Sequence, residues 1–113
     1  MRPLAEHERR LIERLAANLD VEDRRRLLGD LACARVAEER GDGACLIFDL
    51  DGYVRPNTAG QRLYPVEAET GSGDTVVTIL LYSDANGRLL ELEFIGWIDG
   101  TRIDPSWSGL RIW

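Results

Sequence analysis

The chain has 113 residues, of which 44% are hydrophobic and 30% are charged, and its net charge is −6. This length and composition indicate one folded domain and exclude a disordered tail. All 14 basic residues are arginine, and the acidic excess argues against a protein that holds a nucleic-acid backbone, because such a protein needs clustered cations. The charge favours a protein that attracts a basic partner.

The first third of the chain predicts two helices. Apolar residues at helical spacing predict an amphipathic helix over residues 3–18: Leu4, Leu11, Ile12, Leu15 and Leu19. Asp20 has the side chain of a helix N-cap. A shorter helix over residues 21–31 follows, and its apolar side is formed by Leu27, Leu28 and Leu31.

The start of the chain is charged and lacks the apolar segment of a signal peptide, and no later run approaches the ~20 apolar residues of a membrane span. We therefore expect a cytoplasmic protein with no membrane partner. Cys33 and Cys45 are the only cysteines, and in that compartment we expect free thiols.

From residue 34 the apolar pattern alternates with period two, which predicts strands. A hairpin over about residues 34–50 turns at Gly41-Asp42-Gly43. Residues 51–62 form a loop, and further strands occupy about residues 63–98. An aromatic tail over residues 99–113 contains Trp107 and Trp113, which we expect to pack back on the sheet.

Residues 75–98 are the most informative segment. Two runs rich in β-branched and aromatic residues flank Asn86-Gly87, which is a strong hairpin signal. A two-residue loop would pair Leu81 with Leu92, and a four-residue loop would pair Leu81 with Leu90. Both registers place the same side chains on the core face: Val77, Ile79, Leu81, Leu90, Leu92 and Phe94.

Together these elements predict an α+β fold. Two N-terminal helices pack on one face of an antiparallel sheet of about five strands, which are joined as consecutive hairpins. The lack of a linker or an internal repeat predicts a single domain over residues 1–113.

No group of residues predicts catalysis. His7 is the only histidine, which excludes a His-based triad or a multi-histidine metal site within one chain. The string Leu-Ile-Phe-Asp-Leu-Asp-Gly at residues 46–52 resembles the first motif of the haloacid-dehalogenase-like phosphatases, which would make Asp49 a nucleophile and Asp51 a general acid. That family has a parallel sheet with crossover helices, whereas the later residues predict hairpins, so we reject it. We predict a protein that is not an enzyme and uses no metal or cofactor.

The sheet face away from the helices is the predicted partner-binding face. Glu67, Glu69, Glu91 and Glu93 face outward on two strands, and the strand over residues 75–83 lies between them. That strand adds outward apolar side chains and the outward Tyr82, and Trp97 lies nearby. An uncovered apolar strip edged by carboxylates often marks an interaction surface. The alternative is a solvated face, partly covered by the loop at 51–62 or by the tail.

Four strings spread over most of the chain carry a family resemblance. They are Arg2-Pro3-Leu4 leading to Glu8, the Gly-Asp-Gly hairpin, Asp-x-x-Gly-x-Leu-x-Glu-Leu-Glu from Asp84 to Glu93, and the aromatic-Ile-Asp-Gly string from Trp97 to Gly100. In this combination the chain resembles small bacterial immunity proteins of contact-dependent growth inhibition and related polymorphic toxin systems. In that family, a small cytosolic protein binds the toxic C-terminal domain of a secreted or surface effector and blocks its active site.

The resemblance implies an antitoxin that neutralises a cognate toxin domain and makes no direct contact with nucleic acid. The toxins of such systems are often basic nucleases, which fits the net charge of −6. The alternative function is a small-molecule-binding or regulatory α+β domain with a pocket between helices and sheet.

Overall fold

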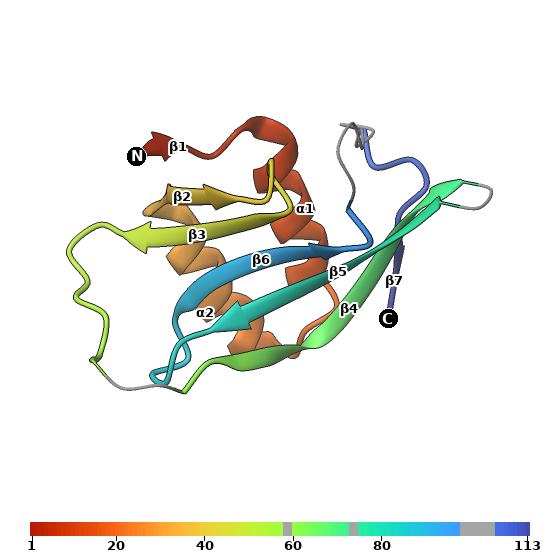
Figure 1. The fold of residues 1–113 in the computed structure, drawn as a ribbon. Helices are drawn as coiled ribbons and strands as arrows, with labels where there is room; N and C mark the ends of the chain where they lie inside the picture. Colours follow the sequence, from red (N-terminus) through yellow and green to blue (C-terminus); the bar gives the residue numbers. More distant parts are fainter. Residues whose placement is uncertain (58–59, 73–74, 98–105) are drawn as a thin grey trace.

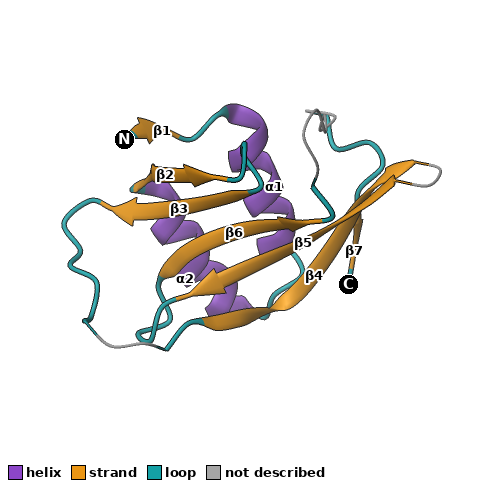
Figure 2. Ribbon diagram, viewed as in Figure 1, coloured by secondary structure: helices purple, strands orange, loops and turns teal. Residues whose placement is uncertain are grey.

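The computed structural model describes residues 1–57, 60–72, 75–97 and 106–113. In these residues two helices, α1 (Glu6–Ala16) and α2 (Val21–Ala32), pack side by side on one face of an antiparallel sheet (Figures 1 and 2). The described strands are seven: β1 (Arg2–Pro3), β2 (Ala34–Arg40), β3 (Cys45–Leu50), β4 (Arg62–Ser72), β5 (Thr75–Ser83), β6 (Leu89–Ile95) and β7 (Arg111–Ile112). The predicted α+β class with N-terminal helices is confirmed.

Helix α1 begins at Glu6, so the prediction of a helix from residue 3 is wrong at its start. Arg2 and Pro3 pair instead with β2 and form the edge strand β1. The Glu8 carboxylate accepts a hydrogen bond from the Ala5 amide at 2.7 Å and two from the Arg2 guanidinium, both at 2.9 Å. One side chain therefore caps the helix and holds the edge strand beside it.

Helix α2 begins at residue 21, as predicted, and ends at Ala32, one residue later than predicted. The Asp20 side chain accepts a hydrogen bond from the Asp23 amide at 2.8 Å, which confirms the predicted N-cap. Leu27 and Leu31 are buried in the core, whereas Leu28 is 39% exposed.

The predicted count of about five strands is too low, whereas the three predicted hairpins, β2–β3, β4–β5 and β5–β6, are present. The short strands β1 and β7 extend the sheet at its two edges, and the spatial order is β1-β2-β3-β6-β5-β4-β7. Strand β3 thus lies beside β6, and the chain after β3 passes round the end of the sheet to reach β4 (Figure 1). Each strand pair is antiparallel, which also excludes the parallel phosphatase fold suggested by residues 46–52.

Strands β5 and β6 pair with Leu81 opposite Leu92, the register predicted for the two-residue loop. The register shifts after Tyr82, however, which lengthens the loop and places an extra residue in β6. As a result Leu89 is fully buried, whereas Leu90, which was predicted to face the core, is only partly buried. The prediction that Leu90 faces the core is therefore wrong, and the preceding residue, Leu89, takes that place.

Trp107 is the largest fully buried side chain and enters the core beside α1. Its indole nitrogen donates a hydrogen bond to the His7 carbonyl at 2.8 Å, and its own carbonyl accepts one from the Arg14 guanidinium at 2.9 Å. These bonds hold Trp107 in a left-handed backbone conformation with φ of 56°. The end of the chain is thus tied to the first helix.

Three sequence predictions fall partly outside the described residues: the rest of the loop at 58–59, the turn at 73–74, and the strand end and tail over 98–105. Where the chain is described, neither helix has both the length and the apolar character needed to cross a membrane.

Candidate partner-binding face

The sheet surface opposite the helices, called the outer face below, is formed by outward side chains of β3, β6, β5 and β4. No described helix or strand lies over it (Figure 2). The structure places five of the predicted site residues on this face: Glu67, Glu69, Tyr82, Glu91 and Glu93. The predicted position of β5, between the two strands that carry the glutamates, is confirmed.

Strand pairing sets the spacing of the carboxylates. Glu67 and Glu93 both face Leu80 from neighbouring strands, so about 10 Å separates them across three strands. Glu91 and Glu93 are two residues apart on β6, which corresponds to about 7 Å. These distances do not exceed the Debye length of about 10 Å at 0.1 M salt, so the negative potentials of the three carboxylates add.

Hydrogen bonds orient two of the glutamates. Glu91 accepts hydrogen bonds from the Cys45 thiol and from the Gln61 amide, both at 3.3 Å, and Glu93 accepts one from the Tyr82 hydroxyl at 2.9 Å. All these donors are neutral, so none of them forms an ion pair with the carboxylates.

Negative charge is concentrated away from the helices. Helices α1 and α2 carry six arginines and six carboxylates, whereas strands β3 to β6 carry five carboxylates and one arginine. Glu69 forms an ion pair with Arg111 of β7. Across the described residues, no ion pair reaches Glu67, Glu91 or Glu93. Arg40 on β2 is paired with Glu38 and acts on Glu91 only as a more distant charge, so this part of the outer face is acidic.

Exposed apolar side chains lie on the same face, beside these carboxylates. Val76 is 44% exposed and Ile95 is 49% exposed. The backbone of Trp113 pairs with that of Glu67 through two hydrogen bonds of 2.8 Å, which places the Trp113 side chain on the outer face by alternation. Trp113 is 57% exposed and lines a shallow hollow with Leu63 and other residues of β4 and β5. The sequence predicted that Trp113 packs on the sheet, and the tail as partial cover of this face, but it did not name Trp113 as a site residue.

Trp97, the remaining predicted site residue, lies elsewhere. Its ring packs against the inward-facing Phe94 with ring centroids 5.4 Å apart. The chain turns at Gly96, where φ is 95° and a β-carbon would lie 2.7 Å from the Val76 carbonyl oxygen. This turn ends the alternation of β6 and directs Trp97 away from the outer face.

The titratable neighbours of the glutamates have shifted pKa values. Burial and the adjacent Glu91 raise the pKa of the Cys45 thiol to about 12. Burial and the hydrogen bond to Glu93 raise the pKa of Tyr82 to about 12. Both groups are protonated at neutral pH, so the thiol is a weak nucleophile there. In the described part of the chain, no group of three or more His, Cys, Asp or Glu side chains is arranged to hold a metal ion.

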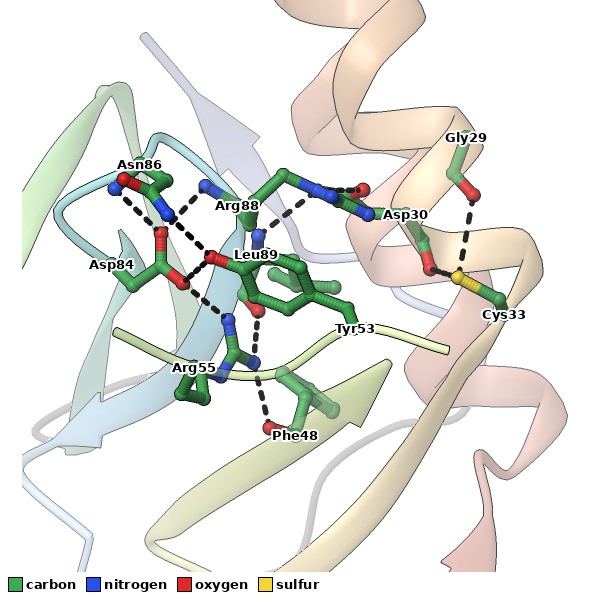
Figure 3. A network of polar contacts seen from close by, with 10 residues as sticks. All are labelled: Gly29, Asp30, Cys33, Phe48, Tyr53, Arg55, Asp84, Asn86, Arg88 and Leu89. Carbon is green, nitrogen blue, oxygen red and sulfur yellow. Dashed lines mark hydrogen bonds and ion pairs between the residues drawn. The ribbon is translucent and has the colours of Figure 1, made fainter. Parts of the chain in front are cut away.

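A polar network that the sequence did not predict lies at the end of the sheet and joins the loop after β3 to the β5–β6 loop (Figure 3). The Asp84 carboxylate accepts hydrogen bonds from the Tyr53 hydroxyl at 2.6 Å and from the Arg55 guanidinium at 2.9 Å. It also accepts bonds from the backbone amides of Asn86 at 2.9 Å and Arg88 at 3.0 Å. Although burial favours the neutral form, these bonds outweigh it and hold the pKa of Asp84 below its usual range.

The same network reaches helix α2. Asp30 is 5% exposed, and its carboxylate accepts bonds from the Arg88 guanidinium at 2.7 Å and from the Leu89 amide at 3.0 Å. The Arg88 guanidinium lies over the Tyr53 ring at 4.3 Å from its centroid (Figure 3). The donors and acceptors of the network thus pair with one another. Such a network stabilises the contacts of the loop after β3 with the β5–β6 hairpin and of this hairpin with helix α2.

Comparisons with protein families, with curated proteins and with solved structures gave no match. The outer face therefore has to be interpreted from its own geometry and charge.

Proposed function

We propose that this protein is a non-catalytic, cytoplasmic immunity protein. It binds a basic toxin domain through the outer face and blocks that domain's active site. The observation that carries the proposal is the group of three carboxylates, Glu67, Glu91 and Glu93, that lies beside exposed apolar side chains and has no cation in an ion pair with it among the described residues.

The physical argument concerns both affinity and rate. A protein interface typically has an apolar, aromatic-rich centre and a polar rim, and Trp113 with Leu63 supplies such a centre beside Glu67. An acidic rim speeds the encounter with a basic surface and selects its orientation. For a nuclease toxin, carboxylates about 7 Å apart on β6 would occupy the cationic groove that otherwise holds substrate phosphates.

The test of this function is a growth assay. The C-terminal toxin domain of the effector encoded immediately upstream is expressed alone or together with this protein. We expect growth arrest with the domain alone and restored growth on co-expression, with recovery of a stable complex. A harmless domain, or one that arrests growth in both strains, would contradict the proposal.

The charge-reversal variant Glu91→Arg/Glu93→Arg locates the interface. We expect the association rate with the inactivated toxin domain to fall at least about ten-fold at low salt and its salt dependence to flatten, because the steering charge is inverted. Stopped-flow fluorescence at several salt concentrations measures both effects.

A matched control changes the net charge equally on the other side of the molecule. Glu13 and Glu22 are exposed on the helices, so Glu13→Arg/Glu22→Arg should slow association far less. Equal slowing by the two double variants would show that only the net charge matters and would remove the outer face from the interface.

A further inference from the structure

A second surface feature lies where the β2–β3 turn, the start of α1 and the end of β6 meet. It is a hollow of about 150 Å³. Its apolar wall includes Phe94, Trp97 and Trp107, and its polar rim includes Glu8, Glu39 and Asp42. The apolar wall side chains belong to the helix side of the sheet, so this hollow is separate from the outer face.

The aromatic wall is held in a defined position. The Phe94 and Trp97 rings are tilted by 47° with centroids 5.4 Å apart. Trp107 is fixed from both ends by its bonds to the His7 carbonyl and the Arg14 guanidinium. A rigid wall of this kind loses little conformational entropy when a ligand group is inserted.

The rim has an excess of negative charge. Arg2 donates hydrogen bonds to both Glu8 and Glu39, so one guanidinium serves two carboxylates. Asp42 has no ion pair among the described residues, and the Gly41–Gly43 turn holds it with φ of 58°. Three carboxylates against one arginine leave a net charge of about −2 at the mouth when His7, which also lines the hollow, is neutral.

Size and chemistry together define the ligand group. A volume of about 150 Å³ is far below the 300 Å³ or more of pockets for drug-sized molecules, and it matches a cavity that admits a single ring-sized group. Aromatic side chains beside carboxylates favour a cation. Among protein cations the guanidinium is planar, weakly hydrated and stacks on aromatic rings, which suits this wall better than a strongly hydrated ammonium does.

We propose that this hollow binds the side chain of an arginine presented by a protein partner. The site is independent of the outer face, and its occupancy does not require the partner to be a toxin. Charge complementarity between the acidic mouth and the guanidinium selects the ligand, and Trp97, the half-buried member of the aromatic wall, supplies most of the aromatic contact area.

The experiment uses a small probe with the intact protein. Nα-acetyl-arginine methylamide is titrated while the indole N–H signals of the three tryptophans are followed by NMR, and the neutral citrulline analogue of the same shape serves as the reference. We expect saturable shifts of the Trp97 and Trp107 signals with the arginine probe, and no saturable shift with the citrulline analogue.

Trp113 is an internal control because it lies on the outer face. Shifts confined to the Trp113 signal, or equal responses to the two probes, would overturn the proposal. Neither outcome would bear on the growth assay, so failure of this site and failure of the immunity function are distinguishable.

Rim variants test the role of charge. Asp42→Asn/Glu39→Gln should weaken binding of the arginine probe about five-fold or more, because it removes two of the three carboxylates. Asparagine tolerates the left-handed conformation at position 42, so the turn is expected to survive. The control Asp49→Asn/Glu22→Gln removes two exposed carboxylates elsewhere and should leave probe binding unchanged; equal weakening by both pairs would overturn the site.

Discussion

Replacing Trp107 with alanine should lower the free energy of unfolding by about 4 kcal/mol, the usual cost of truncating a buried aromatic side chain. The residue is 2% exposed, and the substitution also leaves the His7 carbonyl without its indole donor. Since small domains are stable by only about 5–15 kcal/mol, the variant is expected to be largely unfolded at modest urea concentrations. Urea denaturation followed by far-UV circular dichroism measures the change.

Trp113→Ala is the matched control for this experiment. Trp113 is 57% exposed, so its removal should change the free energy of unfolding by less than about 1 kcal/mol. If the two tryptophan variants were equally stable, the burial of Trp107 described above would be wrong.

The second large effect is expected for Asp84→Asn. The substitution keeps the shape of the side chain but removes the charge that faces the partly buried Arg55, at a cost of about 3 kcal/mol. The Arg55 side chain is 22% exposed, so water compensates for the lost partner only in part. Asp51→Ala is the control, because its 3.8 Å ion pair with Arg35 is exposed and should contribute less than about 1 kcal/mol.

The charge of Asp84 also makes the stability of the protein depend on pH. The folded protein depresses the pKa of Asp84, so this carboxylate contributes stability that is present above its unfolded pKa of about 3.9 and is lost as the pH falls through its lower folded value. The stability difference between the wild-type protein and Asp84→Asn should therefore be full at neutral pH and shrink below about pH 4. A difference that stays constant down to pH 2 would show that the charge of Asp84 is not responsible.

The sequence predicted the parts of the fold that depend on local periodicity. The second helix, its cap at Asp20, and the outward direction of Glu67, Glu91 and Glu93 all follow from spacing along one element. The register of β5 and β6 was one of two predicted registers, because both keep the same set of side chains on the core face.

The errors concern features that local periodicity does not determine. The strand order beyond the hairpins was left open, because the pairing of β3 with β6 depends on which strands bury one another's apolar faces, which no single segment encodes. Leu90 and Trp97 were misplaced because a bulge and a glycine turn interrupt the alternation of β6. Gly96 directly before Trp97 was the available signal, since glycine inside a strand pattern often marks such a break.

The network around Asp84 could be predicted only in part. The Asp-Ala-Asn-Gly string indicated a turn, and Asp84 does accept bonds from the amides of its own loop. Its partners Tyr53 and Arg55 come from a loop without periodicity, about thirty residues earlier, so their contact depends on the path of the chain round the sheet.

The bond between Trp107 and the His7 carbonyl spans 100 residues and has a consequence for synthesis of the chain. Helix α1 is translated well before Trp107, so the surface that Trp107 covers stays uncovered until Trp107 has left the ribosome. Such distant contacts slow folding, because a long loop must be closed before any stabilisation is gained. Until then this apolar surface of the nascent chain is open to chaperones and proteases.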